Sequence, residues 1–96
     1  MLSWHDPGVT TAQILVADDD EAIAASVRRA LVYEGYDVFV VHDGSAALRS
    51  AVERPFDLFV LDVMMPELDG VEVCRLIRAD SDVPILMLTA RDALTV

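Results

Sequence analysis

Four short apolar segments recur along this chain, and a stretch with helical spacing follows each of the first three. The apolar segments, predicted to be strands, are residues 13–17, 36–41, 56–62 and 83–89. The predicted helices between them are residues 21–34, 42–53 and 71–79. Strands joined through helices run in the same direction and pair through right-handed crossovers. The order therefore predicts an α/β fold built on a parallel sheet.

The helical segments carry apolar residues at intervals of three and four. The clearest stripe, in 21–34, consists of Ile23, Val27, Ala30 and Leu31, and Gly35 follows it as a left-handed terminator. The shorter segments show the pair Leu48 and Val52 and the group Val73, Leu76 and Ile77. Each stripe is expected to pack against the sheet.

Length and composition exclude several classes of protein. Ninety-six residues that are 54% hydrophobic suffice for one domain with a real core. No apolar run approaches the roughly 18 residues of a membrane span, and the first residues lack the basic start and apolar region of a secretory signal. We therefore expect a cytoplasmic protein without membrane association. Residues 1–12 lack periodicity and are expected to be a flexible leader before a domain at 13–96.

The charge is strongly negative. Seventeen acidic residues face seven basic ones, all of them arginine, for a net charge of −10. Such a surface repels the phosphate backbone, so direct binding of nucleic acid by this chain is not expected. Converging carboxylates instead attract divalent cations.

Acidic residues stand where predicted strands end. Asp18, Asp19 and Asp20 follow the first strand, and Asp62 closes the third. The carboxyl ends of parallel strands share one edge of the sheet, where ligands bind in such folds. Clustered carboxylates repel one another unless they are neutralised, and Mg²⁺ is the natural neutraliser. An aspartate beside such a cation can act as a nucleophile toward a phosphoryl group.

Simpler interpretations exist for the same residues. The three aspartates can form a solvated loop with a helix cap, and Asp20 is expected to be only a cap. Asp62 can be a turn residue, and Thr89, at the end of the fourth strand, can cap a following helix. We expect Cys74 to be a packed thiol and Met87 to belong to the core. His5 and His42 are expected at the surface.

Three segments in this order carry a family resemblance. "ILVADDDEA", "FVLDVMMPELDG" and "PILMLTARD" resemble the receiver domain of bacterial two-component response regulators, and most closely the OmpR/PhoB-like winged-helix group. The resemblance covers about residues 13–96. It implies a flavodoxin-like (CheY-like) parallel sheet with strand order 2-1-3-4, in which the family's fifth strand and last helix are absent.

The resemblance also implies roles for individual residues. Asp62 would be the phosphoacceptor that takes a phosphoryl group from a sensor histidine kinase. Asp18 and Asp19 would serve Mg²⁺ (or Mn²⁺), Asp19 directly and Asp18 through water. The backbone carbonyl of Met64 would be a further metal ligand.

Other residues match the family's switch. Thr89 would be the switch hydroxyl and Ala90 the small residue that leaves room for the phosphoryl group, while Pro66 and Gly70 would shape the loop beneath Asp62. The implied protein is a signalling switch that controls an output such as transcription. It would not be an enzyme beyond slow self-dephosphorylation.

The chain departs from the family at its end. The family has a lysine on a fifth strand, and this chain contains no lysine. An apolar fourth strand would then form an open sheet edge, so a dimer or higher oligomer is expected. A non-phosphorylated dimerisation or docking module is the alternative. A third interpretation is an aspartyl-phosphate phosphatase, but enzymes of that class have an aspartate at the position where this chain has Met64.

Overall fold

The computed structural model describes residues 11–88. Its strands are β1 (Gln13–Ala17), β2 (Asp37–Val41), β3 (Leu58–Asp62) and β4 (Ile85–Leu88). Its helices are α1 (Glu21–Tyr33), α2 (Gly44–Glu53) and α3 (Gly70–Arg78). Strands and helices alternate along the chain as the sequence predicts.

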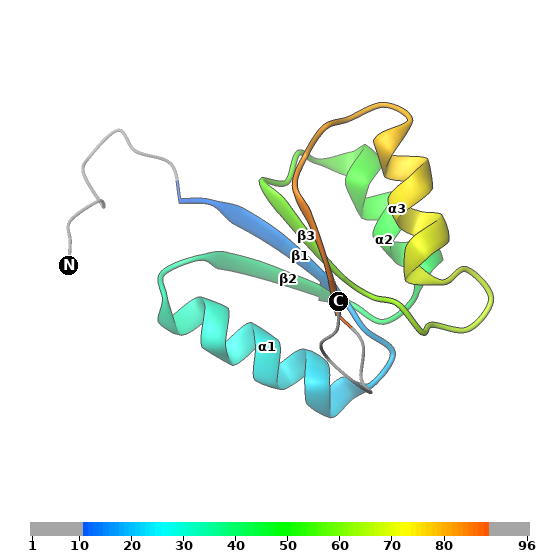
Figure 1. Ribbon diagram of the computed structural model, residues 1–96. Coiled ribbons are helices and arrows are strands. Elements are labelled where there is room, and N and C mark those ends of the chain that lie inside the picture. Colours follow the sequence, from blue (N-terminus) through cyan, green and yellow to red (C-terminus); the bar gives the residue numbers. More distant parts are fainter. Residues whose placement is uncertain (1–10, 89–96) are drawn as a thin grey trace.

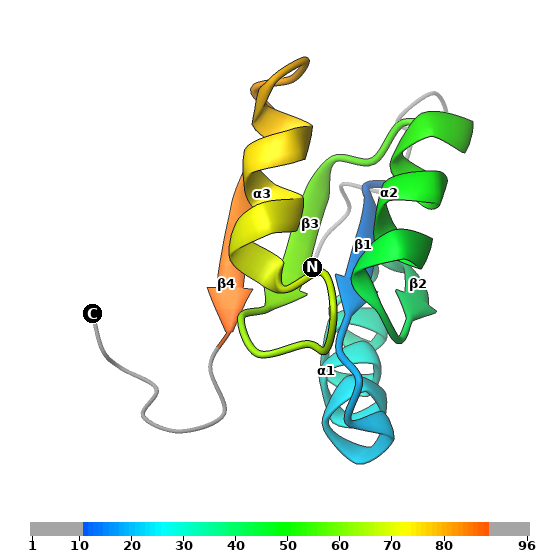
Figure 2. The ribbon, with the colours of Figure 1, turned by 90° about the vertical axis from the view of Figure 1, so that its right-hand side faces the viewer.

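The four strands form one parallel sheet in the order β2-β1-β3-β4. This order confirms the predicted flavodoxin-like arrangement. Helix α1 covers one face of the sheet, and α2 and α3 cover the other (Figures 1 and 2). The strand order reverses between β1 and β3, which is where a sheet of this kind binds its ligands.

The core has two halves, one on each face of the sheet. Leu15 and Leu61 point toward α2 and α3, where they pack with Val73. Val16 and Val60 point the opposite way, toward α1. The central strands β1 and β3 are therefore buried on both faces, as their unbroken apolar runs predict.

The helix faces match the expected stripes in part, because Val27, Leu31 and Leu48 pack against the core while other stripe residues do not. In α1 the buried residue is Ala24, whereas Ile23 is 36% exposed. In α2 the buried residues are Gly44 and Ala47, and Val52 is 87% exposed. The expected stripes were wrong at these positions because the residue nearest the sheet is a small alanine. Its size lets the helix approach closely, and spacing of the larger side chains does not reveal it.

An aspartate caps the start of each of the three helices within residues 11–88. Asp20, Asp43 and Asp69 each accept hydrogen bonds from backbone N–H groups of the first turn. The prediction that Asp20 is a cap is confirmed, and α2 begins two residues later than predicted because Asp43 is its cap. Gly35 has a φ of 100°, the left-handed conformation expected after α1.

Residues 1–10 and 89–96 lie outside the described residues, so the boundaries of the predicted leader and domain stay predictions. The first strand begins at Gln13, where the predicted domain begins. Within residues 11–88, no helix has the length and apolar character needed to cross a membrane.

Candidate metal centre

The sheet register brings the predicted acidic residues together. Ala17 of β1 pairs with Leu61 of β3, so the residues that follow, Asp18 and Asp62, come to the same level. Figure 2 shows the strands pointing to a common edge. One carboxylate oxygen from each of Asp18, Asp19 and Asp62 lies within 4.8 Å of the others. Asp19 and Asp62, which are 43 positions apart in sequence, thus share one site with Asp18.

Two of these three carboxylates are buried. Asp18 is 2% exposed and Asp62 is 6% exposed, whereas Asp19 faces solvent. Among residues 11–88 the one ion pair joins Arg75 to Glu72 on the surface of α3. No arginine therefore pairs with the cluster in this part of the chain. Buried like charges of this kind require a proton or a cation.

The pKa of Asp62 reflects this need for a proton or a cation. The pKa of this carboxyl is raised from 3.8 to about 6, and burial is the largest cause. The negative charges of Asp18 and Asp19 contribute to this rise, while the backbone N–H of Met64 opposes it by donating to Asp62 Oδ1 at 3.3 Å. Burial and the neighbouring charges thus oppose the ionisation of Asp62. A cluster of three such carboxylate oxygens suits a hard divalent cation.

Asp18 is held in place by three backbone contacts. Its Oδ1 accepts the N–H of Asp20 at 2.9 Å, and its own N–H donates to the carbonyl of Val41 at 3.2 Å. The carbonyl of Asp18 lies 3.0 Å from Nδ1 of His42. His42 is exposed, as expected, but sequence reasoning missed this contact because it joins loops 24 residues apart.

The loop after Asp62 turns back sharply. The N–H of Gly70 donates to the carbonyl of Val63 at 3.1 Å, and the N–H of Val63 donates to Leu88 of β4 at 2.9 Å. A Cβ at Gly70 would lie 2.2 Å from the carbonyl oxygen of Asp62. Only glycine fits there, which confirms that Gly70 shapes the loop beneath Asp62.

The remaining predicted site residues have different outcomes. The side chain of Met64 is 64% exposed, and its backbone N–H contacts Asp62. The role of its carbonyl as a metal ligand stays a prediction. Thr89 and Ala90 lie outside the described residues, so their roles also stay predictions.

Comparison with known proteins decides the family. Residues 14–96 match the response regulator receiver domain. The chain belongs to this family. It is thus a receiver domain of two-component signalling rather than a classical enzyme, and receiver domains bind Mg²⁺ at an acidic pocket such as the one formed here.

The curated relatives are response regulators. The response regulator MprA of Mycobacterium ulcerans is 54% identical over 87 residues, which cover 88% of this chain and 37% of the relative. The MprA of Mycobacterium avium is 55% identical over 85 residues, or 86% of this chain and 37% of the relative. The chain therefore spans just over a third of these relatives. Their kinship agrees with the predicted OmpR/PhoB-like group.

Solved structures share the fold. The response regulator TrrA of Thermotoga maritima, in complex with Mg²⁺ and beryllofluoride, is 34% identical with a TM-score of 0.81, over 85% of this chain and 72% of the other. The chemotaxis protein CheY4 of Vibrio cholerae is 36% identical with a TM-score of 0.81, over 88% of this chain and 72% of the other.

Proposed function

We propose that Asp62 is the phosphoacceptor of this receiver domain and that Asp18 and Asp19 hold Mg²⁺ beside it. The observation that carries the proposal is the convergence of three carboxylate oxygens within 4.8 Å at the carboxyl ends of β1 and β3. Mn²⁺ has similar ligand preferences and would serve as a substitute. The phosphoryl donor would be the phosphohistidine of a sensor histidine kinase.

In the proposed reaction a carboxylate oxygen of Asp62 attacks the phosphorus atom. A new P–O bond forms, the P–N bond to the donor histidine breaks, and the leaving imidazole takes up a proton. The bound cation would neutralise charge on the transferring oxygens. The chain's own contribution is to bury the nucleophile and to fix its orientation through the N–H of Met64.

The remaining family residues complete the proposal. The carbonyl of Met64 would add a metal ligand, Thr89 would bind a phosphoryl oxygen, and Ala90 would leave space for it. The change at Thr89 would be relayed to an output, most naturally transcription in the cytoplasm, that depends on parts of the relatives which this chain does not span. Hydrolysis of the phosphoryl group by the chain itself would be slow.

Phosphorylation by a small donor tests this proposal. Acetyl phosphate with Mg²⁺ should add one phosphoryl group to the chain in intact-mass spectra, and Asp62→Asn should abolish the addition. Asp82→Asn, an exposed position before β4, is the matched control and should react like the wild type. An adduct that persists in Asp62→Asn would refute the assignment, and the absence of an adduct in the wild type would favour the docking module below.

A second candidate function is a non-phosphorylated dimerisation or docking module. Two observations favour it. The chain has no lysine, and β4 forms one edge of the sheet within residues 11–88, with Leu86 52% exposed. An unprotected apolar edge strand can pair with another chain.

Light scattering tests the proposed association through β4. The wild-type chain should show a mass above that of a monomer at micromolar concentration. Leu86→Lys should lower the mass, because a charge on an edge strand opposes pairing. Val71→Lys, at another exposed apolar position on α3, should not. A wild-type monomer would count against this interface.

A further inference from the structure

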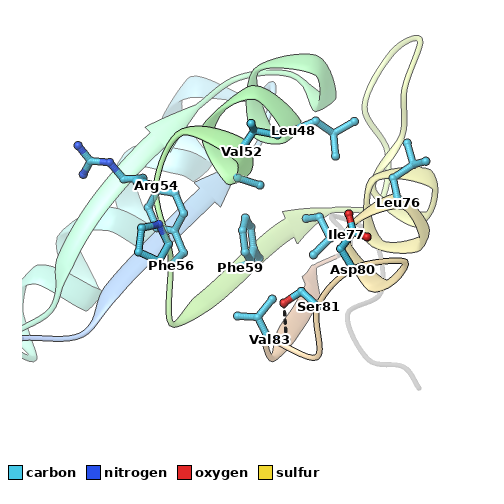
Figure 3. Close-up of a pocket in the computed structure, with 12 residues that line it drawn as sticks. Leu48, Val52, Arg54, Phe56, Phe59, Leu76, Ile77, Asp80, Ser81 and Val83 are labelled. Atoms are coloured by element: carbon cyan, nitrogen blue, oxygen red, sulfur yellow. Dashed lines mark hydrogen bonds between the residues drawn. The ribbon is translucent and has the colours of Figure 1, made fainter.

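A cavity lies at the end of the sheet opposite the carboxylates. Its volume is about 450 Å³. It opens between the carboxyl-terminal halves of α2 and α3, next to residues that precede β3 and β4 (Figure 3). Its apolar lining includes Leu48, Val52, Phe56, Phe59, Leu76 and Val83. No residue of the acidic site takes part in this lining.

The pocket has aromatic walls, and a few polar residues line it as well. Phe56 makes edge contacts with Phe39 and Phe59, at ring-centroid distances of 5.6 Å and 5.5 Å. Asp80, Ser81 and Arg54 add polar groups to the lining, and Ser81 Oγ already accepts the N–H of Val83 at 3.1 Å (Figure 3). Pockets of about 300–1,000 Å³ that combine apolar walls with a few polar groups are typical binding sites. A bulky aromatic group with one hydrogen-bond donor would suit both features.

Apolar wall residues of this pocket remain open to solvent. Val52 is 87% exposed and Leu76 is 37% exposed, although both line the cavity. Both side chains come from helices that flank the opening in Figure 3. An apolar occupant would remove them from water, which favours its binding.

The first described residues of the chain lie beside this pocket. The N–H of Gln13 donates to Asp57 Oδ2 at 2.7 Å, and the N–H of Asp57 donates to the carbonyl of Gln13 at 2.7 Å. Asp57 follows Phe56, which forms part of the pocket wall. The chain therefore enters β1 one residue away from a pocket wall.

The segment that precedes β1 contains a suitable occupant. Trp4, the one tryptophan of the chain, lies nine residues before Gln13. At about 3.3–3.6 Å per extended residue, nine residues span up to roughly 30 Å, so even a bent segment can reach the cavity. An indole has a large apolar surface and one N–H donor, which matches the walls and the acceptor oxygens of the lining.

We propose that this pocket is a docking site for the chain's own residues 1–10, with the indole of Trp4 as the inserted group. The contact would join the start of the chain to α2 and α3. It would form independently of phosphorylation at Asp62, since the pocket lies at the other end of the sheet. Insertion of Trp4 from a second copy is the competing arrangement.

Fluorescence of Trp4 tests the proposal in the full chain. Selective excitation of tryptophan should give emission at a shorter wavelength than that of a peptide of residues 1–10, with weaker quenching by acrylamide. Val52→Asp should shift the emission toward that of the peptide, because it places a charge at the apolar opening. Leu76→Asn should do the same from the α3 side.

Val32→Asp is the matched control. Val32 is the penultimate residue of α1, as Val52 is of α2, it is also exposed, and α1 covers the other face of the sheet. Its substitution should leave the emission unchanged, and circular dichroism verifies that every variant is folded.

Three results would overturn the proposal. The first is wild-type emission equal to that of the peptide, and the second is an equal shift in Val52→Asp and Val32→Asp. The third is a blue shift that disappears on dilution, because it would assign the pocket to a second copy.

Discussion

Replacing Asp62 with asparagine should stabilise the metal-free domain at pH 7. Asp62 is 6% exposed, and its pKa is raised to about 6 by burial and by the charges of Asp18 and Asp19. Ionisation at pH 7 therefore opposes folding. Asparagine keeps the shape and the acceptor for the N–H of Met64 but carries no charge.

The size of the effect follows from the pKa shift. A rise from 3.8 to about 6 is near two pH units, and each unit corresponds to about 1.4 kcal/mol. The expected gain in the free energy of unfolding is thus about 2–3 kcal/mol at pH 7. For a domain of this size that corresponds to a rise in Tm of about 10 °C or more.

The direction of the pKa shift also determines how the stability of the domain depends on pH. Because the folded-state pKa of Asp62 is raised, the folded state binds more protons than the unfolded state between pH 4 and pH 6. Stability from this group is present below about pH 4 and is lost as the pH rises through about 6. The wild type should therefore lose stability relative to Asp62→Asn over this window.

Urea unfolding followed by circular dichroism, with EDTA present, measures this difference from pH 4 to pH 7.5. Asp82→Asn is the control for removal of one negative charge from an exposed position. Added Mg²⁺ should stabilise the wild type more than Asp62→Asn, since a ligand that binds only the folded state adds stability by mass action. The reasoning is refuted if Asp62→Asn is less stable than the wild type at pH 7 without metal.

Three further substitutions probe how the fold supports the site. Leu15→Ala, at a position with no exposed surface in β1, should cost about 2–5 kcal/mol in urea unfolding; a loss below 1 kcal/mol would contradict the assigned core. Gly70→Ala should lower both Tm and phosphorylation by acetyl phosphate, because the new Cβ would lie 2.2 Å from the carbonyl oxygen of Asp62; unchanged phosphorylation would show that the loop adapts. Asp20→Ala should cost about 1 kcal/mol through loss of the α1 cap, with Mg²⁺ binding in calorimetry retained; loss of binding would make Asp20 part of the metal site.

The sequence was sufficient to predict the sheet because the apolar runs of β1 and β3 are long, unbroken and separated by helical segments. Their register then places Asp18 beside Asp62, which the motif already suggested. The N-cap at Asp20 and the left-handed residue Gly35 after α1 could also be predicted, because each of these features depends on one residue.

Other features depend on tertiary packing and could not be predicted. Ala24 of α1 and Ala47 of α2 are buried because these helices approach the sheet closely, and alanine carries little hydrophobic signal in a sequence. The contact between His42 and the carbonyl of Asp18 joins two loops, and no local sequence pattern shows that these loops lie close together. The pocket beside Phe59 exists only once α2 and α3 converge.

The central strands explain how the fold tolerates its acidic cluster. Leu15, Val16 and Leu61 are fully buried. Their burial offsets the free-energy cost of placing the buried carboxylates Asp18 and Asp62 at the same edge of the sheet. A cation or a proton removes that cost directly. The free energy of unfolding should consequently depend more on what occupies the site than on any surface contact, since the one ion pair among residues 11–88 is exposed. A cation that binds only the folded site should therefore stabilise the two central strands whose ends form it.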